Sequence, residues 1–280
     1  MENKLIKIVT DSSSDLKSYA YANFATAPLK ITTAEREFTD DSSLDTLEMV
    51  TYLGSYNGRS TTSCPNTEDW IKAFGGADIV FCITMTSALS GTYNSAMLAK
   101  RTYEESGENR QVYVIDSLST GPEIALIADR ISELISEKAS PDEIYAKAVE
   151  YKKSTGLLFM LESMKNLANN GRVIPIAAKM AGILGIRVVG KASDKGELEL
   201  LEKCRGETRA IEEMYSQMKA MGYAGGKVKL TNCFNPNAAA QLEALIKAEY
   251  PNAITEIYAC GGLCSFYAEN HGMLVGFEHN

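Results

Sequence analysis

Short apolar runs alternate with longer amphipathic stretches through the first half of the chain. Short runs rich in β-branched residues are typical of buried strands, whereas apolar residues at helical spacing predict helices. Ile124, Ile127 and Ile131 show that helical spacing. We predict strands at 4–9, 25–31, 79–84 and 112–115, and helices at 44–52, 68–74, 90–105, 120–137 and from 140 onward. This alternation favours a parallel sheet with helices on both faces.

The pattern changes near Gly156. Two runs, 186–189 and 197–203, flank a polar turn and predict a hairpin, which requires antiparallel pairing. The other predicted strands are 157–161, 228–231, 254–259 and 273–277, and the predicted helices are 162–169, 208–221 and 236–249. We therefore predict an α/β protein of two domains. Residues 1–155 form a Rossmann-like domain with a parallel sheet, and residues 156–280 form an α/β domain with a mixed sheet.

Polar residues follow three of the predicted strands, in the sequences IVTDSS, CITMTS and YVIDSLSTG. In open α/β sheets, ligands bind beyond the carboxyl ends of the strands. These three strand ends therefore predict a ligand crevice at one edge of the N-terminal sheet. The alternative is that Asp11, Asp116 and their neighbouring serines only cap the helices that follow.

The segment Ile79–Tyr93, IVFCITMTSALSGTY, is the strongest candidate for a binding site. A helix start leaves backbone N–H groups unpaired and carries partial positive charge, and Gly91 permits a ligand to approach closely. Hydroxyls crowd the turn before this helix, on Thr84, Thr86, Ser87, Ser90 and Thr92. Because the turn contains no lysine, metal ligand or base, it favours holding a carboxylate over breaking a bond. The alternative is an ordinary serine cap.

A polar loop, STTSCP at 60–65, precedes a predicted helix. Pro65 restricts the residue before it to extended geometry, which constrains the directions of the Thr62 and Ser63 side chains. These two residues are candidates for ligand binding if the loop faces Ser90. Otherwise the loop is a turn followed by a helix cap.

Other features also have two interpretations. The stretch 174–186, IPIAAKMAGILGI, is rich in small residues, which permit either close helix packing or a narrow apolar tunnel. His271 either faces a ligand or lies on the surface. Arg172, Lys203 and Arg205 are either solvated surface charges or a docking patch for an acidic or phosphate-bearing partner.

Composition narrows the possible functions. Of 280 residues, 45% are hydrophobic, and no apolar run approaches the ~20 residues of a membrane-spanning helix. The polar N-terminus does not resemble a signal peptide, so we expect a cytoplasmic protein. A net charge of −8 without a basic stretch disfavours nucleic-acid binding. The 6 cysteines form no C-x-x-C pair and there are only 2 histidines, so we expect free thiols and no metal site.

Several catalytic motifs are missing. The chain contains no G-x-x-x-x-G-K-[ST] phosphate loop, and no G-x-G-x-x-G follows the first predicted strand. The sequence ALSGT around Ser90 is not the G-x-S-x-G of a nucleophile elbow, which disfavours a hydrolase.

Several motifs together resemble the DegV family. They are IKIVTDSSSDL, TTSCP, TSALSGTYNSA, VIDS, the pair Gly171-Arg172 and GELELLEKCRG, and they span nearly the whole chain in the family's order. The resemblance implies a two-domain α/β fatty-acid binder whose acyl chain lies in a tunnel between the domains. The best understood members are subunits of bacterial fatty-acid kinase that present the carboxylate to a separate kinase subunit, which forms the acyl phosphate.

The resemblance also implies roles for individual residues. The family's carboxylate-binding threonine matches Thr62 or Ser63, its S-G-T serine matches Ser90, and its basic residues match Arg172, Lys203 and Arg205. Two departures stand out. The family's H-T-G-P-G is here within FYAENHGMLVGF, where His271 is close to but outside that pattern, and its I-K-P is here Ile186-Arg187-Val188.

We therefore hypothesise a non-catalytic subunit that binds a long-chain fatty acid and no other cofactor. The expected ligand-binding residues are Thr62, Ser63, Ser90, Gly91, Thr92 and His271, and the expected partner is a fatty-acid kinase subunit. One alternative is an enzyme that acts on a small carboxylate or phosphate ester, with Asp11 and Asp116 as its acids. Another is a regulatory module that senses lipid.

Overall fold

A four-stranded parallel sheet forms the centre of the N-terminal half of the computed structural model, which describes residues 4–173 and 185–280. Its strand order is β2 (Phe24–Ala27), β1 (Ile6–Asp11), β6 (Ile79–Thr84) and β7 (Gln111–Asp116). Successive side chains of a strand point to opposite faces, so Val9 and Ile8 lie in different cores. Helices α2 (Thr67–Phe74) and α3 (Thr92–Glu105) cover the Val9 face, and α4 (Pro122–Ser136) and α5 (Pro141–Tyr151) cover the Ile8 face.

A small antiparallel sheet extends this half and carries the predicted Thr62 loop. It contains β4 (Glu37–Thr39), β3 (Lys30–Thr32) and β5 (Thr61–Ser63), next to α1 (Thr46–Ser55). The single strand predicted at 25–31 is wrong, because β2 and β3 lie in different sheets with Pro28 between them. Proline has no N–H to continue a ladder, so the chain changes sheets there. A short 3-10 helix, η1 (Ser12–Ser14), follows β1.

The C-terminal half is built on a six-stranded mixed sheet. Its order is β10 (Leu198–Arg205), β9 (Ile186–Ala192), β8 (Thr155–Leu161), β13 (Met273–Glu278), β11 (Val228–Asn232) and β12 (Thr255–Ala259). Only the β11–β12 pair is parallel, and β9 and β10 form the predicted hairpin. One face packs on α8 (Glu207–Ala220) and α9 (Pro236–Glu249). Two short helices, α6 (Lys165–Asn169) and α10 (Gly262–Ala268), pack on the other face.

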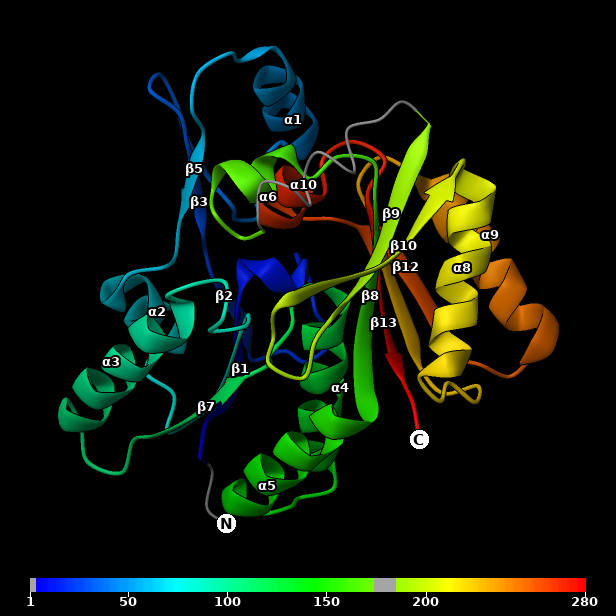
Figure 1. Cartoon of the computed structure of the whole chain (residues 1–280). Coiled ribbons are helices and arrows are strands. Elements are labelled where there is room, and N and C mark those ends of the chain that lie inside the picture. The colour runs from blue at the N-terminus through cyan, green and yellow to red at the C-terminus, as the bar shows by residue number, and fades with distance from the viewer. Residues whose placement is uncertain (1–3, 174–184) are drawn as a thin grey trace.

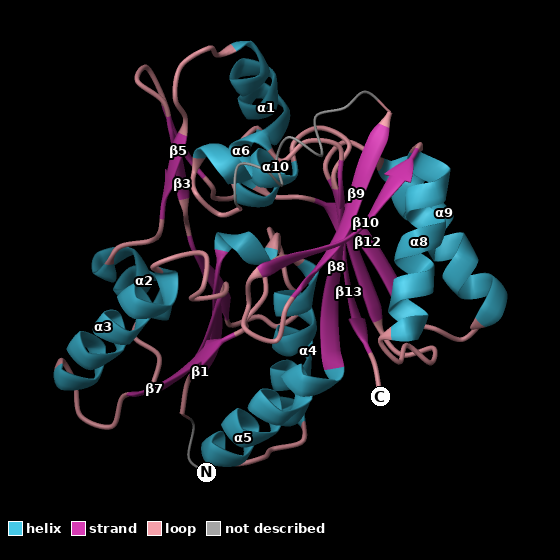
Figure 2. Ribbon diagram, in the orientation of Figure 1, coloured by secondary structure: helices cyan, strands magenta, loops and turns pink. Residues whose placement is uncertain are grey.

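Helix α4 contacts strands of both large sheets, namely β1 and β6 on one side and β8, β11 and β13 on the other. Figure 2 shows the resulting layers, with α4 between the two sheets and α8 and α9 outside them. The approach of β13 to α4 is close, because a Cβ on Gly276 would lie 2.6 Å from the backbone nitrogen of Glu123. The two-domain α/β fold, parallel in one sheet and mixed in the other, confirms the predicted fold class.

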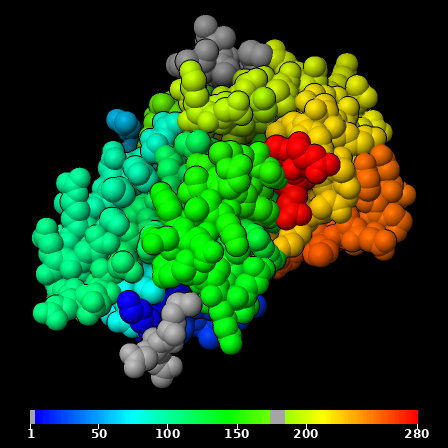
Figure 3. All heavy atoms as spheres, turned by 90° about the horizontal axis from the view of Figure 1, so that it is seen from below, coloured from blue at the N-terminus to red at the C-terminus, as the bar shows by residue number. Residues whose placement is uncertain are grey.

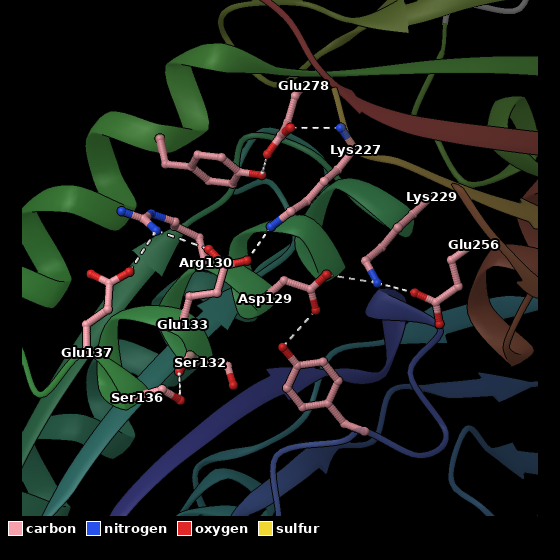
Figure 4. A network of polar contacts seen from close by, with 12 residues as sticks. Asp129, Arg130, Ser132, Glu133, Ser136, Glu137, Lys227, Lys229, Glu256 and Glu278 are labelled. Carbon is pink, nitrogen blue, oxygen red and sulfur yellow. Dashed lines mark hydrogen bonds and ion pairs between the residues drawn. The ribbon is translucent and has the colours of Figure 1, made fainter. Parts of the chain in front are cut away.

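Ion pairs also join α4 to the C-terminal sheet (Figure 4). The ammonium of Lys229, whose side chain is only 7% exposed, lies 3.0 Å from Asp129 and also pairs with Glu256. Burial disfavours the charged amine, but the two carboxylates outweigh it and raise the pKa of Lys229. Lys227 pairs with Glu133 of α4 in the same network. These contacts hold α4 against strands β11 and β12 of the C-terminal sheet.

The C-terminal residues pack against the segment that joins the two halves of the chain. Figure 3 shows them in red between residues in green and residues in yellow. The backbone N–H of His279 donates to Ser154 at 2.8 Å, and a ring nitrogen of His279 lies 3.0 Å from the carbonyl of Thr155. Ser154 is the last residue of the 3-10 helix η2 (Lys152–Ser154), and Thr155 is the first residue of β8. His279, which follows β13, therefore holds the point where η2 meets β8.

Two helix starts follow the sequence signals closely. Ser140 caps α5 in a capping box with Glu143, and Pro141 is the first helical residue. Asn66 and Asp69 form the same reciprocal box at the start of α2. Among the helices of the described residues, none is long and apolar enough to cross a membrane.

Candidate functional site

A pocket lies where the carboxyl ends of the N-terminal sheet face the inner face of the C-terminal sheet. We call it the central pocket, and it encloses about 690 Å³ of atom-free space, its open mouth included. Most of its wall is aliphatic. The wall includes Leu29, Leu89, Leu157, Phe159, Leu161, Leu198 and Leu274.

Strand alternation explains this apolar wall. Leu157, Phe159 and Leu161 of β8 point into the pocket, while Leu158 and Met160 between them pack in the core against α8. A strand buried on both faces needs apolar residues at every position, which is why 157–161 is a continuous apolar run. The parallel-sheet side contributes residues from its strand ends, as the sequence predicted.

Four hydroxyls and a guanidinium line much of the remaining wall, on Thr62, Ser90, Thr120, Tyr267 and Arg172. Thr62 Oγ1 lies 2.7 Å from the hydroxyl of Tyr267, and Ser90 and Arg172 line the same pocket. Burial raises the pKa of Tyr267, so its phenol stays protonated and able to donate. Arg172 Nε donates to the carbonyl of Leu89 at 3.1 Å, which fixes the guanidinium beside the Ser90 turn. Hydroxyl donors and a cation together suit a carboxylate.

The other predicted hydroxyls lead away from the pocket. Thr92 is fully buried and donates to Asp11 at 3.2 Å, while Thr86 donates to the carbonyl of Gly196 at 2.9 Å. Ser63 follows Thr62 in β5, so its side chain points to the opposite face, where it is exposed. Gly91 is the N-cap of α3 and is also exposed. Of these predicted ligand-binding residues, the structure brings Thr62 and Ser90 to the central pocket.

Thr86 contacts the C-terminal half instead. Its partner Gly196 is at the tip of the β9–β10 hairpin, at φ 76°, and a Cβ there would lie 2.1 Å from Thr86 Oγ1. Leu198, two residues further along the hairpin, lines the central pocket. The hydroxyl of Thr86 therefore fixes the hairpin that carries part of the pocket wall.

Asp11 and Asp116 have structural roles. Asp11 accepts hydrogen bonds from the backbone N–H groups of Ser13 and Met85 and from two hydroxyls, and it shows no exposed surface. Burial raises the pKa of Asp11 to about 6 against the opposing effect of those bonds. Asp116 accepts from the backbone of Ser87 and Leu118. Neither carboxylate lines the central pocket. Asp11 caps the 3-10 helix η1, as the capping interpretation expects. Asp116 caps none of the described helices, because α4 follows its N-cap Gly121 without a side-chain cap, and it holds the turns at Ser87 and Leu118 instead.

His271 lies outside the central pocket. Its side chain is 48% exposed, and Nδ1 lies 2.9 Å from a carboxylate oxygen of Glu162. Tyr267, four residues earlier in the chain, lines the pocket instead.

Tyr267 was not predicted as a site residue. Leu263 and Tyr267 stand at i and i+4, a helical spacing that places both on one face of α10, and both line the pocket.

The three predicted docking residues differ in their exposure. Arg172 is half-buried at the pocket wall, whereas Lys203 and Arg205 are exposed on strand β10, on either side of the buried Cys204. The predicted small-residue tunnel at 174–186 falls almost entirely outside the described residues.

The cysteines are free thiols, as the sequence predicted. All 6 cysteines are free, and five of them are buried. Within 4–173 and 185–280, no three histidines, cysteines or carboxylates group in a way that would hold a metal ion.

Two buried aspartates from the N-terminal half hold the start of α10. Asp40 accepts from the backbone N–H groups of Gly262 at 2.7 Å and Leu263 at 2.9 Å, and Asp15 accepts from Gly261 at 2.7 Å. Burial raises the pKa of Asp15 to about 7, and the neighbouring Asp40 adds to the effect. Tyr267 therefore owes its position to carboxylates on the other half of the molecule.

The raised pKa of Asp15 predicts a pH-dependent stability. The folded state binds a proton at Asp15 that the unfolded chain, with an aspartate pKa of about 3.9, does not bind between about pH 4 and pH 7. The stabilising contribution of Asp15 is therefore complete below about pH 4 and is lost as the pH rises through about 7. Asp15→Asn keeps the oxygen that accepts from Gly261 and removes this titration. Denaturant unfolding of both proteins should show the wild type losing stability relative to the variant between pH 4.5 and pH 7.5, and a difference independent of pH would contradict the assignment.

The central pocket is apolar along most of its wall and polar at Thr62, Ser90, Thr120, Arg172 and Tyr267, so it suits a molecule that is itself apolar with one anionic end. The chain thus has the architecture of an α/β protein with an amphipathic pocket between two sheets. The sequence model of the DegV family, described as "Uncharacterised protein, DegV family", matches residues 5–277. The chain belongs to the DegV family.

Known relatives extend over the same length. A DegV domain-containing protein of Streptococcus pyogenes serotype M3 is 40% identical over 276 residues, which cover 97% of this chain and 99% of the relative. A DegV family protein from Eubacterium eligens, loaded with heptadecanoic acid, is 38% identical with a TM-score of 0.96, and the match covers 98% of this chain and 100% of that one. The fatty acid kinase (Fak) B3 protein of Streptococcus pneumoniae, loaded with linoleic acid, is also 38% identical with a TM-score of 0.96, and covers 99% and 100%.

Proposed function

We propose that this protein binds a long-chain fatty acid in the central pocket and presents its carboxylate to a separate kinase subunit, which forms the acyl phosphate. The observation that carries the proposal is the pairing of an aliphatic wall with Thr62, Ser90, Arg172 and Tyr267. The Eubacterium eligens and Streptococcus pneumoniae relatives, both loaded with fatty acids, support it.

Binding energy and orientation come from different parts of the pocket. Burying each CH₂ group contributes roughly 0.8 kcal/mol, so a long acyl chain supplies a gross ~10 kcal/mol before ordering costs. Hydrogen bonds to a charged oxygen contribute about 1.5–3 kcal/mol each. The aliphatic wall then provides affinity, and the hydroxyls decide where the carboxylate lies.

In this proposal the protein itself catalyses nothing and needs no cofactor. Residues 1–155 supply Thr62 and Ser90, and residues 156–280 supply most of the acyl wall together with Tyr267. Lys203 and Arg205 are exposed and cationic, which suits docking of the kinase subunit, while Arg172 lines the pocket. The structural roles of Asp11 and Asp116 weigh against an enzyme that uses them as acids.

Native mass spectrometry tests the proposal directly. Protein purified from a bacterial host should carry one fatty acid per chain, or should take one up from oleic acid after delipidation. Folded protein that carries no fatty acid and acquires none on incubation would overturn the proposal. Adding a purified fatty-acid kinase subunit and a nucleotide should then yield acyl phosphate only when the lipid-loaded protein is present.

A further inference from the structure

An aromatic ring lies over a glycine in the wall of the central pocket. Phe159 of β8 pairs across the sheet with Gly190 of β9 on one side and with Leu274 of β13 on the other. A Cβ built on Gly190 would lie 2.3 Å from Cζ and 2.6 Å from Cε2 of Phe159. The ring therefore occupies the space that any side chain at position 190 would need.

This arrangement determines how far the ring reaches into the pocket. Directly paired residues of neighbouring strands have side chains on the same face, so a residue other than glycine would push the ring away from β9. The backbone of the sheet lies beneath the ring of Phe159, so the ring cannot move into the sheet. Leu157 and Leu161, at the adjacent inward positions of β8, flank the ring along the strand. A displaced ring would have to stand up into the pocket. With glycine at 190, the ring leans over β9 and takes up less of the pocket than an upright ring would.

The width of the pocket matters because acyl chains differ in shape. An extended saturated chain has a narrow cross-section, whereas a cis double bond bends the chain and requires a wider channel. Two aromatic residues, Phe159 and Tyr267, line the pocket, and Phe159 is the one without a polar group. A stiff ring yields less to a ligand than the leucines around it.

We propose that the Phe159–Gly190 pair sets the width of the acyl channel and thereby lets this protein accept bent, cis-unsaturated fatty acids. The inference rests on the proposed function and adds the class of acyl chain that the pocket selects. Phe159 acts on specificity by its shape, and Gly190 acts through Phe159.

A competition between two fatty acids of equal length tests the inference. Delipidated protein is incubated with equimolar oleic and stearic acid, and the bound species are counted by native mass spectrometry. Gly190→Ala should shift the oleate-to-stearate ratio about tenfold toward stearate, the scale on which a pocket discriminates small differences in shape. Phe159→Leu should shift the ratio in the opposite direction. Gly54→Ala is the matched control, since a Cβ there meets nothing within 4 Å.

The outcomes separate the two proposals. If the wild type binds neither acid, the proposed function fails. If the wild type binds fatty acid but Phe159→Leu and Gly190→Ala keep the wild-type ratio, the inference fails and the proposed function stands. A Cβ at position 190 would also lie 2.6 Å from the carbonyl oxygen of Glu199, so Gly190→Ala strains the hairpin. If that variant does not fold, the ratio measured for Phe159→Leu decides alone.

Discussion

Replacing Ser90 by alanine is expected to weaken fatty-acid binding by about 10- to 100-fold. A hydrogen bond to a charged group contributes about 1.5–3 kcal/mol, and each 1.4 kcal/mol is a factor of ten in Kd. Ser90 is the one hydroxyl of the 84–92 run that lines the central pocket, so its loss leaves the carboxylate without a donor on that side. Isothermal titration of delipidated protein with oleate measures the change.

Ser87→Ala provides the matched control for this result. Ser87 is an exposed serine in the same turn and does not line the pocket, so its removal should leave Kd unchanged. Ser90 also accepts a 3.3 Å hydrogen bond from the backbone of Thr92, and the loss of such a bond costs about 0.5–1.5 kcal/mol of stability. Both variants should therefore be titrated at a temperature where circular dichroism shows them folded. Wild-type affinity in Ser90→Ala would place the carboxylate elsewhere.

Replacing Lys229 by methionine is expected to lower the free energy of unfolding by about 2–3 kcal/mol. Removing one partner of a buried ion pair costs about 3–5 kcal/mol, because the remaining charge stays unpaired in a poor solvent. We expect a smaller loss than this, because the side chains of Glu256 and Asp129 are 57% and 25% exposed. Water can therefore solvate the two carboxylates after Lys229 is removed. Denaturant unfolding monitored by fluorescence measures the effect.

The exposed pair Lys30–Glu37 is the control for Lys229. Lys30→Met should cost less than about 1 kcal/mol, as exposed pairs do. Adding Asp129→Asn and Glu256→Gln to Lys229→Met should recover much of the stability, because no unpaired carboxylate then remains. None of these residues lines the central pocket, so oleate affinity should stay at the wild-type value. If Lys229→Met and Lys30→Met cost the same, the network contributes no more than surface charge.

Local sequence signals predicted much of the fold. Helical spacing of isoleucines identified α4, the Ser140–Pro141–Glu143 signature located the start of α5, and a turn between two runs predicted the β9–β10 hairpin. Each of these signals acts between residues close in sequence. The three-stranded sheet was missed, because its strands are only three residues each and β3 follows β2 after a single turn at Pro28.

The polar part of the pocket was only partly predictable, because some of its residues are positioned by contacts between residues far apart in sequence. Ser90 and Thr62 lie in motifs with a local excess of hydroxyls, whereas Tyr267 belongs to a seven-residue helix with no cap of its own. That helix is held by Asp15 and Asp40, which are distant in sequence, and no periodicity in 262–268 reveals such partners. His271 drew attention because of its chemistry, but its backbone, at φ 66°, directs the ring toward Glu162.

The position of β13 has a consequence for synthesis of the protein. This strand, near the end of the chain, lies inside the C-terminal sheet between β8 and β11, and its Leu274 forms part of the pocket wall. Chains emerge from the ribosome N-terminus first, so the parallel sheet, complete by residue 116, is free to form early. The C-terminal sheet stays split in two until residues up to 278 have emerged. A nascent chain that ends before β13 therefore lacks part of the wall of the central pocket. If the proposed function holds, ribosomes stalled before β13 should carry polypeptide that retains no fatty acid.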